Sequence, residues 1–119
     1  MVTAHRKLYV PHQGDVVWLE FNPQAGHEQA GLRPAFVISP KSYNGLVGLA
    51  LMCPITSKVK GYPFEVLLPK QFKVKGAILS DQIKSLDFRA RKAKWLAKVP
   101  AEIITEVLAK IQTIIKYHS

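Results

Sequence analysis

The stretch GHEQAGLRP at residues 26–34 runs directly into the apolar residues AFVI at 35–38. It predicts a loop of reactive side chains anchored by a buried strand, which is a common way to build a site. Its two glycines reach backbone angles closed to other residues, so the loop can bring Glu28 and Arg33 onto one phosphate-sized ligand. The alternative is a glycine-rich hairpin loop with solvated charges, and these residues alone favour that alternative.

Size and charge indicate one domain with a polyanionic partner. The 119 residues are 48% hydrophobic, ample for a single buried core, so we expect one domain over residues 1–119. The chain has 17 Lys and Arg against 8 Asp and Glu, a net charge of +9, and its pI of about 9.9 is in the range of nucleic-acid binders. The charges are spread over loops, whereas a membrane-surface protein would more often show a basic amphipathic helix.

Cysteine usage and hydropathy predict a cytoplasmic protein. The lone Cys53 cannot form an intramolecular disulfide, and it lies in the apolar run 49–55, where it suits a small buried hydrophobe. No signal-peptide core opens the sequence, and no apolar run approaches the roughly 18 residues of a membrane span. We therefore expect a reducing compartment, no membrane association and a flexible basic arm over residues 1–8.

Short segments rich in β-branched and aromatic residues predict a mainly β fold. Asn44-Gly45 lies between two apolar runs and is a strong hairpin signal. Short strands separated by roughly ten to fifteen residues are typical of a small barrel or a curled sheet. The expected strands are 16–21, 34–39, 46–54, 64–68, 77–79 and, more weakly, 94–99.

The last segment has a helical period instead. Ile103, Val107, Ile111 and Ile115 recur every four positions, and Pro100 suits the first helical position. This pattern predicts an amphipathic helix over residues 100–117. We expect its apolar face to cover the sheet or a partner subunit.

Four loop clusters offer side chains for binding or chemistry, at 26–34, 54–61, 62–65 and 80–91. Arg33 has the fixed fork of donors that grips a phosphate, although a surface charge or an ion pair with Glu28 would explain it equally well. The hydroxyl of Thr56 can donate to a phosphate oxygen or accept from the local backbone.

The third and fourth clusters suit single-stranded nucleic acid. Tyr62 and Phe64 would stack on unpaired bases, although Phe64 is equally suited to the core. The fourth cluster mixes amide, acidic and basic side chains that can contact base edges and the backbone: Asp81, Gln82, Lys84, Arg89 and Arg91.

The sequence lacks the residue patterns of several common metal and nucleotide-binding sites. The four histidines show no metal-ligand spacing, a single cysteine excludes a zinc ribbon, and no carboxylate cluster or phosphate-binding glycine motif is present. We therefore expect no metal and no cofactor. Attack by the 2′-hydroxyl of RNA on the neighbouring phosphate needs only alignment, a base, an acid and a cation.

Six short motifs resemble, in order and spacing, the MazF/PemK toxins of bacterial toxin-antitoxin pairs. Each motif is weak alone, and the resemblance covers the chain from about Gly14 to the last helix. The motifs are GDVVW (14–18), EQAG (28–31) with RP (33–34), SP (39–40) with YN (43–44), PIT (54–56), KGYPFEV (60–66) and DQIKS (81–85).

The resemblance implies a small SH3-like barrel of about five to seven antiparallel strands with a C-terminal helix, working as a homodimer. Members are sequence-specific endoribonucleases that cut single-stranded RNA without metal, leaving 2′,3′-cyclic phosphate and 5′-hydroxyl ends. The catalytic arginine of the family corresponds to Arg33, its catalytic threonine to Thr56 and its functional loop glutamate to Glu28.

The expected RNA groove extends beyond these three residues. The resemblance places Gln29, Asn44, Lys84, Arg89 and Arg91 along it. The loop clusters add Ser57, Lys58, Tyr62, Phe64 and Gln82. His27 stands where members more often carry a small or hydroxyl residue; it is a solvated loop histidine or a participant in proton transfer.

The resemblance also implies an antitoxin, whose acidic disordered segment we expect to fold across the basic groove. Two other functions remain open. Gyrase-poisoning toxins of this fold use a C-terminal tail that contains tryptophan, whereas this chain ends in IKYHS (115–119). A non-catalytic RNA-binding module would share the charge and the aromatics and would cut nothing.

Overall fold

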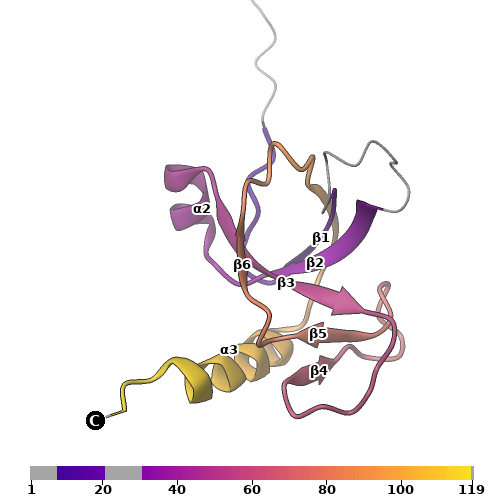
Figure 1. The fold of residues 1–119 in the computed structure, drawn as a ribbon. Coiled ribbons are helices and arrows are strands. Elements are labelled where there is room, and N and C mark those ends of the chain that lie inside the picture. Colours follow the sequence, from indigo (N-terminus) through magenta and orange to yellow (C-terminus); the bar gives the residue numbers. More distant parts are fainter. Residues whose placement is uncertain (1–7, 21–30, 119) are drawn as a thin grey trace, which may run out of the picture.

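The computed structural model describes residues 8–20 and 31–118, which form a curled antiparallel sheet with a long C-terminal helix beneath it (Figure 1). The elements in chain order are β1 (Asp15–Glu20), β2 (Leu32–Val37), α2 (Lys41–Val47), β3 (Ala50–Thr56), β4 (Glu65–Leu67), β5 (Ala77–Leu79), β6 (Lys84–Leu86), β7 (Lys94–Lys98) and α3 (Ala101–Ile115). The predicted mainly β fold with a C-terminal helix is confirmed.

The sheet has seven strands in the order β4-β5-β3-β2-β1-β7, and β6 also pairs with β3. One edge of β3 pairs with β2, while its other edge pairs first with β6 and then with β5. No ladder among the described residues joins β4 to β7, so the curled sheet is not closed into a barrel by hydrogen bonds. The seven antiparallel strands and the C-terminal helix agree with the small barrel-like fold that the resemblance implies.

Two hydrophobic clusters lie on opposite faces of the strands. Because side chains alternate along a strand, Val16 enters one cluster while Val17 and Leu19 enter the other. Helix α3 covers the first cluster with Ile103, Val107 and Ile111, as the four-residue period predicts. No helix in the described part of the chain is long and apolar enough to cross a membrane.

Pro100 was predicted to be the first residue of the helix, but it lies just before α3. It is the N-cap, with extended backbone angles, and the helix begins at Ala101. Cys53 is fully buried in β3, as expected for a small hydrophobe. Burial, together with the charge of Asp81, raises the pKa of its thiol to about 12. The thiol therefore stays protonated at neutral pH.

The predicted hairpin turn at Asn44-Gly45 is wrong, because these residues lie inside α2. The helix ends at Gly48, whose left-handed backbone (φ 82°) lets its N–H donate to the carbonyl of Asn44. Strand β3 consequently begins at Ala50 rather than at residue 46. The sequence analysis also missed β6, whose three residues pair with Ala50–Met52 of β3.

The chain approaches β1 along a segment that is tied to Asp15. The carboxylate of Asp15 accepts from the Tyr9 hydroxyl (2.5 Å) and from the His12 N–H (2.9 Å). Burial, reinforced by Asp15, raises the pKa of Tyr9 and keeps its hydroxyl a donor. The expected flexible arm lies, except for Leu8, outside the described residues.

Candidate functional site

A pocket of about 480 Å³ opens where the start of β2 and the end of β3 meet the loop before β5. Five of the predicted site residues line it together: Arg33, Thr56, Ser57, Lys58 and Gln82. The other lining residues are Trp18, Leu32, Pro34, Pro54, Ile55, Lys75 and Leu79. The pocket therefore combines cationic, hydroxyl and amide groups with an apolar wall, and we refer to it as the Arg33–Thr56 pocket.

Arg33 supplies the guanidinium of this pocket. It is the second residue of β2, opposite Leu19 of β1, and the strand behind it is rigid because Ala35 and Phe36 are fully buried. Among the described residues, no carboxylate or carbonyl oxygen hydrogen-bonds or pairs with the guanidinium. Its fork of donors is thus available to a ligand anion.

Thr56 supplies a hydroxyl at the end of β3. Its Oγ1 accepts from the N–H of Lys58 at 3.0 Å, which is the local backbone contact that the sequence offered as an alternative. That contact orients the side chain without using its proton, because a hydroxyl has one donor and two acceptor positions. Thr56 can therefore still donate to an oxygen bound in the pocket.

Gly76 brings the wall of the pocket close to Thr56. Its backbone has a φ of 119°, and an added Cβ would lie 2.0 Å from the Thr56 carbonyl oxygen. The loop before β5 can thus approach β3 only because residue 76 has no side chain. The next residue, Ala77, pairs with Thr56 and continues this approach into the ladder.

Two further lysines increase the positive charge of the pocket. Lys58 is exposed, and Lys75 reaches the pocket while its ammonium donates to the Lys70 carbonyl. The sequence analysis missed Lys75, because nothing in its local sequence indicates that the loop folds back to Thr56. It also missed Trp18, although the alternation of β1 places this residue on the face opposite Val17 and Leu19.

Other predicted RNA-binding residues lie outside the pocket. Tyr62 is 61% exposed, with the Lys60 ammonium 6.0 Å from its ring centroid. The carboxylate of Glu65 holds this loop by accepting from the N–H groups of Lys60 and Gly61. Phe64 is half-buried, and its carbonyl accepts from Ser80.

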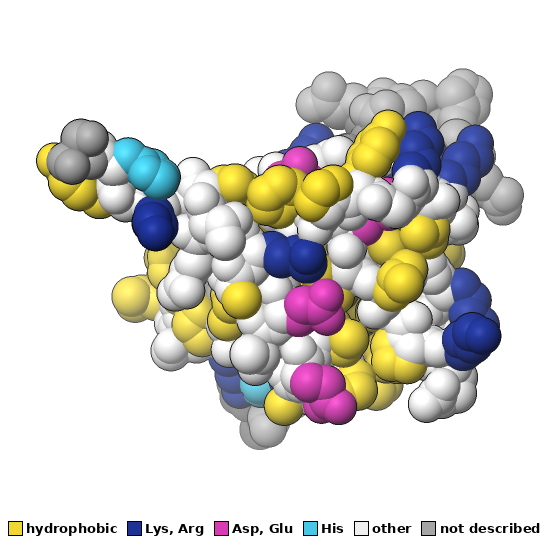
Figure 2. Space-filling model, turned by 90° about the horizontal axis from the view of Figure 1, so that it is seen from below, with side chains coloured by type: hydrophobic (Ala, Val, Ile, Leu, Met, Phe, Trp, Pro, Cys, Tyr) yellow, Lys and Arg dark blue, Asp and Glu magenta, His cyan; other side chains and the backbone are white. Residues whose placement is uncertain are grey.

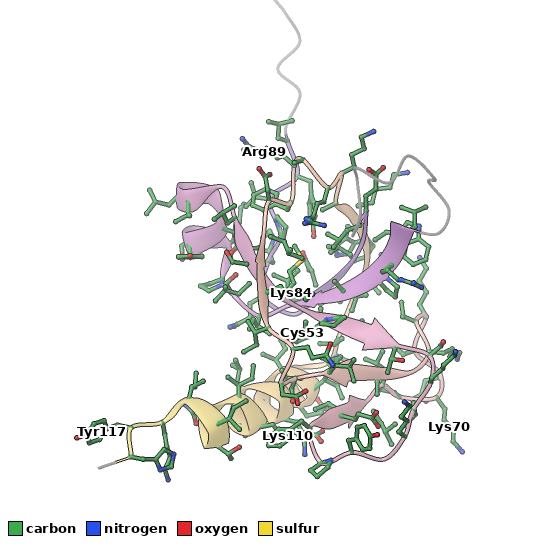
Figure 3. All side chains as sticks on the ribbon, in the orientation of Figure 1. Cys53, Lys70, Lys84, Arg89, Lys110 and Tyr117 are labelled. Carbon is green, nitrogen blue, oxygen red and sulfur yellow. The ribbon has the colours of Figure 1, made fainter. Side chains whose placement is uncertain are left out.

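The basic residues of the fourth cluster are spread along β6 and the following loop (Figure 3). Lys84 is exposed on β6, and the guanidinium of Arg89 lies 5.8 Å from the ring of Phe88. Arg91 is half-buried and donates to the Glu20 carbonyl at 3.1 Å, so it links the loop to β1. None of the three lines the Arg33–Thr56 pocket.

Asn44 does not belong to a groove. Its side chain is fully buried, where its amide nitrogen donates to the carbonyls of Pro11 (2.8 Å) and Ser39 (3.0 Å), and its oxygen accepts from the Ser39 hydroxyl (2.5 Å). The expectation that it contacts RNA therefore fails in this structure, because the side chain faces no solvent. Its role is to tie α2 to the segment before β1.

We expect Asn44→Ala to lower the free energy of unfolding by about 2 to 4 kcal/mol, because it leaves buried acceptors and a buried hydroxyl without their partner. Urea denaturation measures this change. Ser42→Ala, on an exposed position of the same helix, is the matched control and should stay within about 0.5 kcal/mol of the parent protein. Equal stability of the two variants would contradict the structural role.

Three predicted residues, His27, Glu28 and Gln29, lie outside the described residues. Within residues 8–20 and 31–118, no group of three or more His, Cys, Asp or Glu side chains is arranged to hold a metal ion. What the described residues offer is a site for an anion with an adjacent apolar surface.

The chain is similar in sequence to known proteins. The family model for PemK-like, MazF-like toxins of type II toxin-antitoxin systems matches residues 12–115. The endoribonuclease toxin MazF of Escherichia coli K12 is 47% identical over 107 residues, which are 90% of this chain and 96% of that protein.

The fold is also similar to solved structures of the same family. MazF of Deinococcus radiodurans in crystal form I is 52% identical, with a TM-score of 0.82 over 92% of this chain and 99% of that one. A MazE-MazF crystal structure from the same organism, form III, has a TM-score of 0.84 at 49% identity, covering 92% and 100% of the two chains. The similarity spans the elements that form the pocket.

Proposed function

Since the chain belongs to the family of PemK-like, MazF-like toxins of type II toxin-antitoxin systems, we propose that it is an endoribonuclease that cuts single-stranded RNA in the cytoplasm. The relative from Escherichia coli is named an endoribonuclease. The observation that carries the proposal is that Arg33, whose guanidinium has no partner among the described residues, and Thr56, whose hydroxyl is oriented, line one pocket. A phosphate of RNA matches these donors in charge and geometry.

In the proposed reaction the 2′-oxygen of RNA attacks the neighbouring phosphorus, and the bond from phosphorus to the 5′-oxygen breaks. The 2′-hydroxyl proton passes to a base, for which we propose Glu28, and the departing 5′-oxygen takes up a proton. The products are a 2′,3′-cyclic phosphate and a 5′-hydroxyl end. Arg33 stabilises the charge of the pentacoordinate state, and Thr56 donates a hydrogen bond to the same phosphate.

The remaining pocket residues would bind the nucleotides around the cut. Lys58 contributes charge, and Ser57 and Gln82 contribute hydrogen bonds to phosphate or base edges. Gln29 and His27 belong to the loop of Glu28 and are proposed to contact the same RNA. Exposed residues farther away extend the path, at Tyr62, Lys84 and Arg89. We leave out Asn44 and Arg91, whose side chains hydrogen-bond within the protein, and Phe64, which is half-buried.

The decisive test incubates the purified protein with a long single-stranded RNA in EDTA and maps the ends of the fragments. Cuts at one short motif with cyclic-phosphate ends, absent with Arg33→Ala, are the expected result. Intact RNA that still binds the protein would overturn the proposal in favour of a non-catalytic binding module. Such binding would weaken with salt by about 0.7 log units per log unit for each phosphate contact.

We further propose that a protein antitoxin covers the pocket with an acidic segment that is disordered until it binds. The net charge of +9 and the cluster of Arg33, Lys58 and Lys75 support an acidic ligand. A peptide made from that segment should inhibit RNA cleavage competitively. Inhibition that leaves RNA binding unchanged would place the antitoxin elsewhere.

We propose that the toxin is a homodimer that uses the apolar side of α3. A groove of about 530 Å³ lies there, and its lining residues are Ile38, Ser39, Pro40, Tyr43, Leu51, Ile83, Leu108, Ile111 and Ile115. Figure 2 views the molecule from below and shows exposed hydrophobic side chains between charged ones. Exposed apolar surface of this kind is typical of a subunit interface.

Ile115→Asp should therefore shift the protein from dimer to monomer in sedimentation velocity, because a carboxylate would be buried without a partner. Gln112→Asp introduces the same charge at an exposed position of α3 that does not line the groove, and it should leave the dimer intact. Dimers of equal affinity in both variants would contradict this interface.

A further inference from the structure

We propose that Trp18 is a stacking platform for a nucleobase next to the scissile phosphate, and that Lys94 binds the RNA backbone beyond it. This inference rests on the proposed RNA cleavage and adds a subsite to it. Neither residue was singled out as a ligand contact by the sequence motifs. Trp18 lies on β1, on the face opposite Val17 and Leu19, and Lys94 is its pairing partner on β7.

Trp18 is an exposed aromatic residue in an otherwise buried strand. Its neighbours Val17 and Leu19 are fully buried, whereas Trp18 is 38% exposed and lines the Arg33–Thr56 pocket. Leaving a large apolar ring in contact with water has a cost that burying it would remove. A ligand that covers the ring would gain that energy on binding.

The residues beside Trp18 have the chemistry of a base-binding surface. Pro34, Pro54 and Leu79 line the same pocket as the indole and contribute no charged or hydrogen-bonding side-chain group. The guanidinium of Arg33, adjacent in sequence to Pro34, supplies the anion-binding end. One pocket thus combines an indole and other apolar side chains with a phosphate-binding group, and this combination matches a nucleotide.

The register of the sheet continues this surface away from the pocket. Trp18 pairs with Pro34 of β2 on one side and with Lys94 of β7 on the other. Directly paired residues project from the same face, so Pro34, Trp18 and Lys94 form one row across three strands. Lys94 is exposed, and its side-chain ammonium makes no ion pair or hydrogen bond with any other described residue. The row therefore ends in a cation that can meet the next phosphate.

The two tryptophans of the chain allow a direct test of stacking. In Trp95→Phe, only Trp18 emits, and in Trp18→Phe, only Trp95 emits; Trp95 is 54% exposed and does not line the pocket. The probe is an oligonucleotide with the mapped cleavage motif and a 2′-deoxyribose at the scissile nucleotide, which cannot be cut. Stacking predicts that the probe quenches the emission of Trp95→Phe and leaves that of Trp18→Phe nearly unchanged.

A double-mutant cycle separates stacking from a structural role of Trp18. The same probe is made with one abasic nucleotide on either side of the scissile phosphate, which removes a base and keeps its phosphate. For one of the two positions, losing the base should weaken binding to the parent protein by about tenfold. The same loss should have almost no effect on binding to Trp18→Ala. Lys94→Ala should reduce the salt dependence of binding by about one phosphate contact.

Additive effects of Trp18→Ala and of both abasic probes, or equal quenching of the two tryptophans, would overturn the stacking assignment. If Trp18→Ala does not fold, the fluorescence comparison still tests whether a base stacks on Trp18, since it uses only the two Phe variants. The outcome is distinct from failure of the proposed function: a protein that cuts RNA with Arg33-dependent activity yet shows an additive cycle retains the function and loses this subsite.

Discussion

Arg33→Ala should lower kcat/KM for RNA cleavage by about 10²- to 10³-fold or more, while the protein folds with nearly unchanged stability. The guanidinium is exposed and forms no hydrogen bond or ion pair with the rest of the described structure, so its removal leaves no buried partner unsatisfied. What is lost is the donor pair that meets the charge developing on the phosphate. Single-turnover cleavage and urea denaturation measure the two effects separately.

Two further variants make the result specific to Arg33. Arg33→Lys keeps the charge but not the planar fork, and should fall between the parent and Arg33→Ala. Lys41→Ala removes one positive charge at the start of α2, outside the pocket, and should cleave RNA almost normally. An Arg33→Ala protein with near-parental cleavage would exclude Arg33 from the chemistry, and a loss of equal size in Lys41→Ala would reduce its role to net charge.

Gly76→Ala should be more destabilising than the same change at Gly14, Gly45, Gly48 or Gly61. Its Cβ would lie 2.0 Å from the Thr56 carbonyl oxygen, 2.9 Å from the Thr56 carbonyl carbon and 3.2 Å from Ser57 Cα, at a φ of 119°. The loop or the end of β3 must move. We expect a loss of about 3 kcal/mol or more in unfolding free energy. In the folded fraction, cleavage should fall by about 10²-fold, because a shift near 1 Å misplaces Thr56.

Gly48→Ala is the matched control for this experiment. Gly48 also has a positive φ, 82°, yet nothing lies within 4 Å of its added Cβ, and it caps α2 outside the pocket. It carries only the backbone cost of alanine in a left-handed conformation, about 1 to 2 kcal/mol. Cleavage by its folded fraction should be normal. If both alanine variants lose the same unfolding free energy and both still cleave RNA normally, the close approach of Gly76 to Thr56 is not needed for activity.

The sequence predicted those elements whose local pattern matches their environment. Strands β1 and β5 and helix α3 lie close to their expected limits, because short runs of β-branched and apolar residues mark the strands and a four-residue apolar period marks the helix. The Asn44-Gly45 signal failed because tertiary hydrogen bonds to Pro11 and Ser39 outweigh the turn preference of this dipeptide. Strand β6 has no such pattern and exists because β3 offers it a free edge.

The site was predictable to a similar extent. Residue chemistry identified Arg33 and Thr56 as candidates, but only the family resemblance joined them, since separate strands carry them. Lys75 reaches the pocket through the fold of the loop at Gly76, which no local pattern specifies. Trp18 could have been found from the phase of β1, where its neighbours point inward.

Because of the central position of β3, the Arg33–Thr56 pocket is complete only after β3 has paired with both β2 and β5. This strand carries Thr56, receives Arg33 through its pairing with β2, and receives Lys75 and Gln82 through its pairing with β5. A chain still emerging from the ribosome can form the first pairing before the residues of the second have been synthesised. A fragment that stops before β5 lacks one wall of the pocket. Synthesis that is interrupted before β5 would therefore release a fragment without a complete pocket.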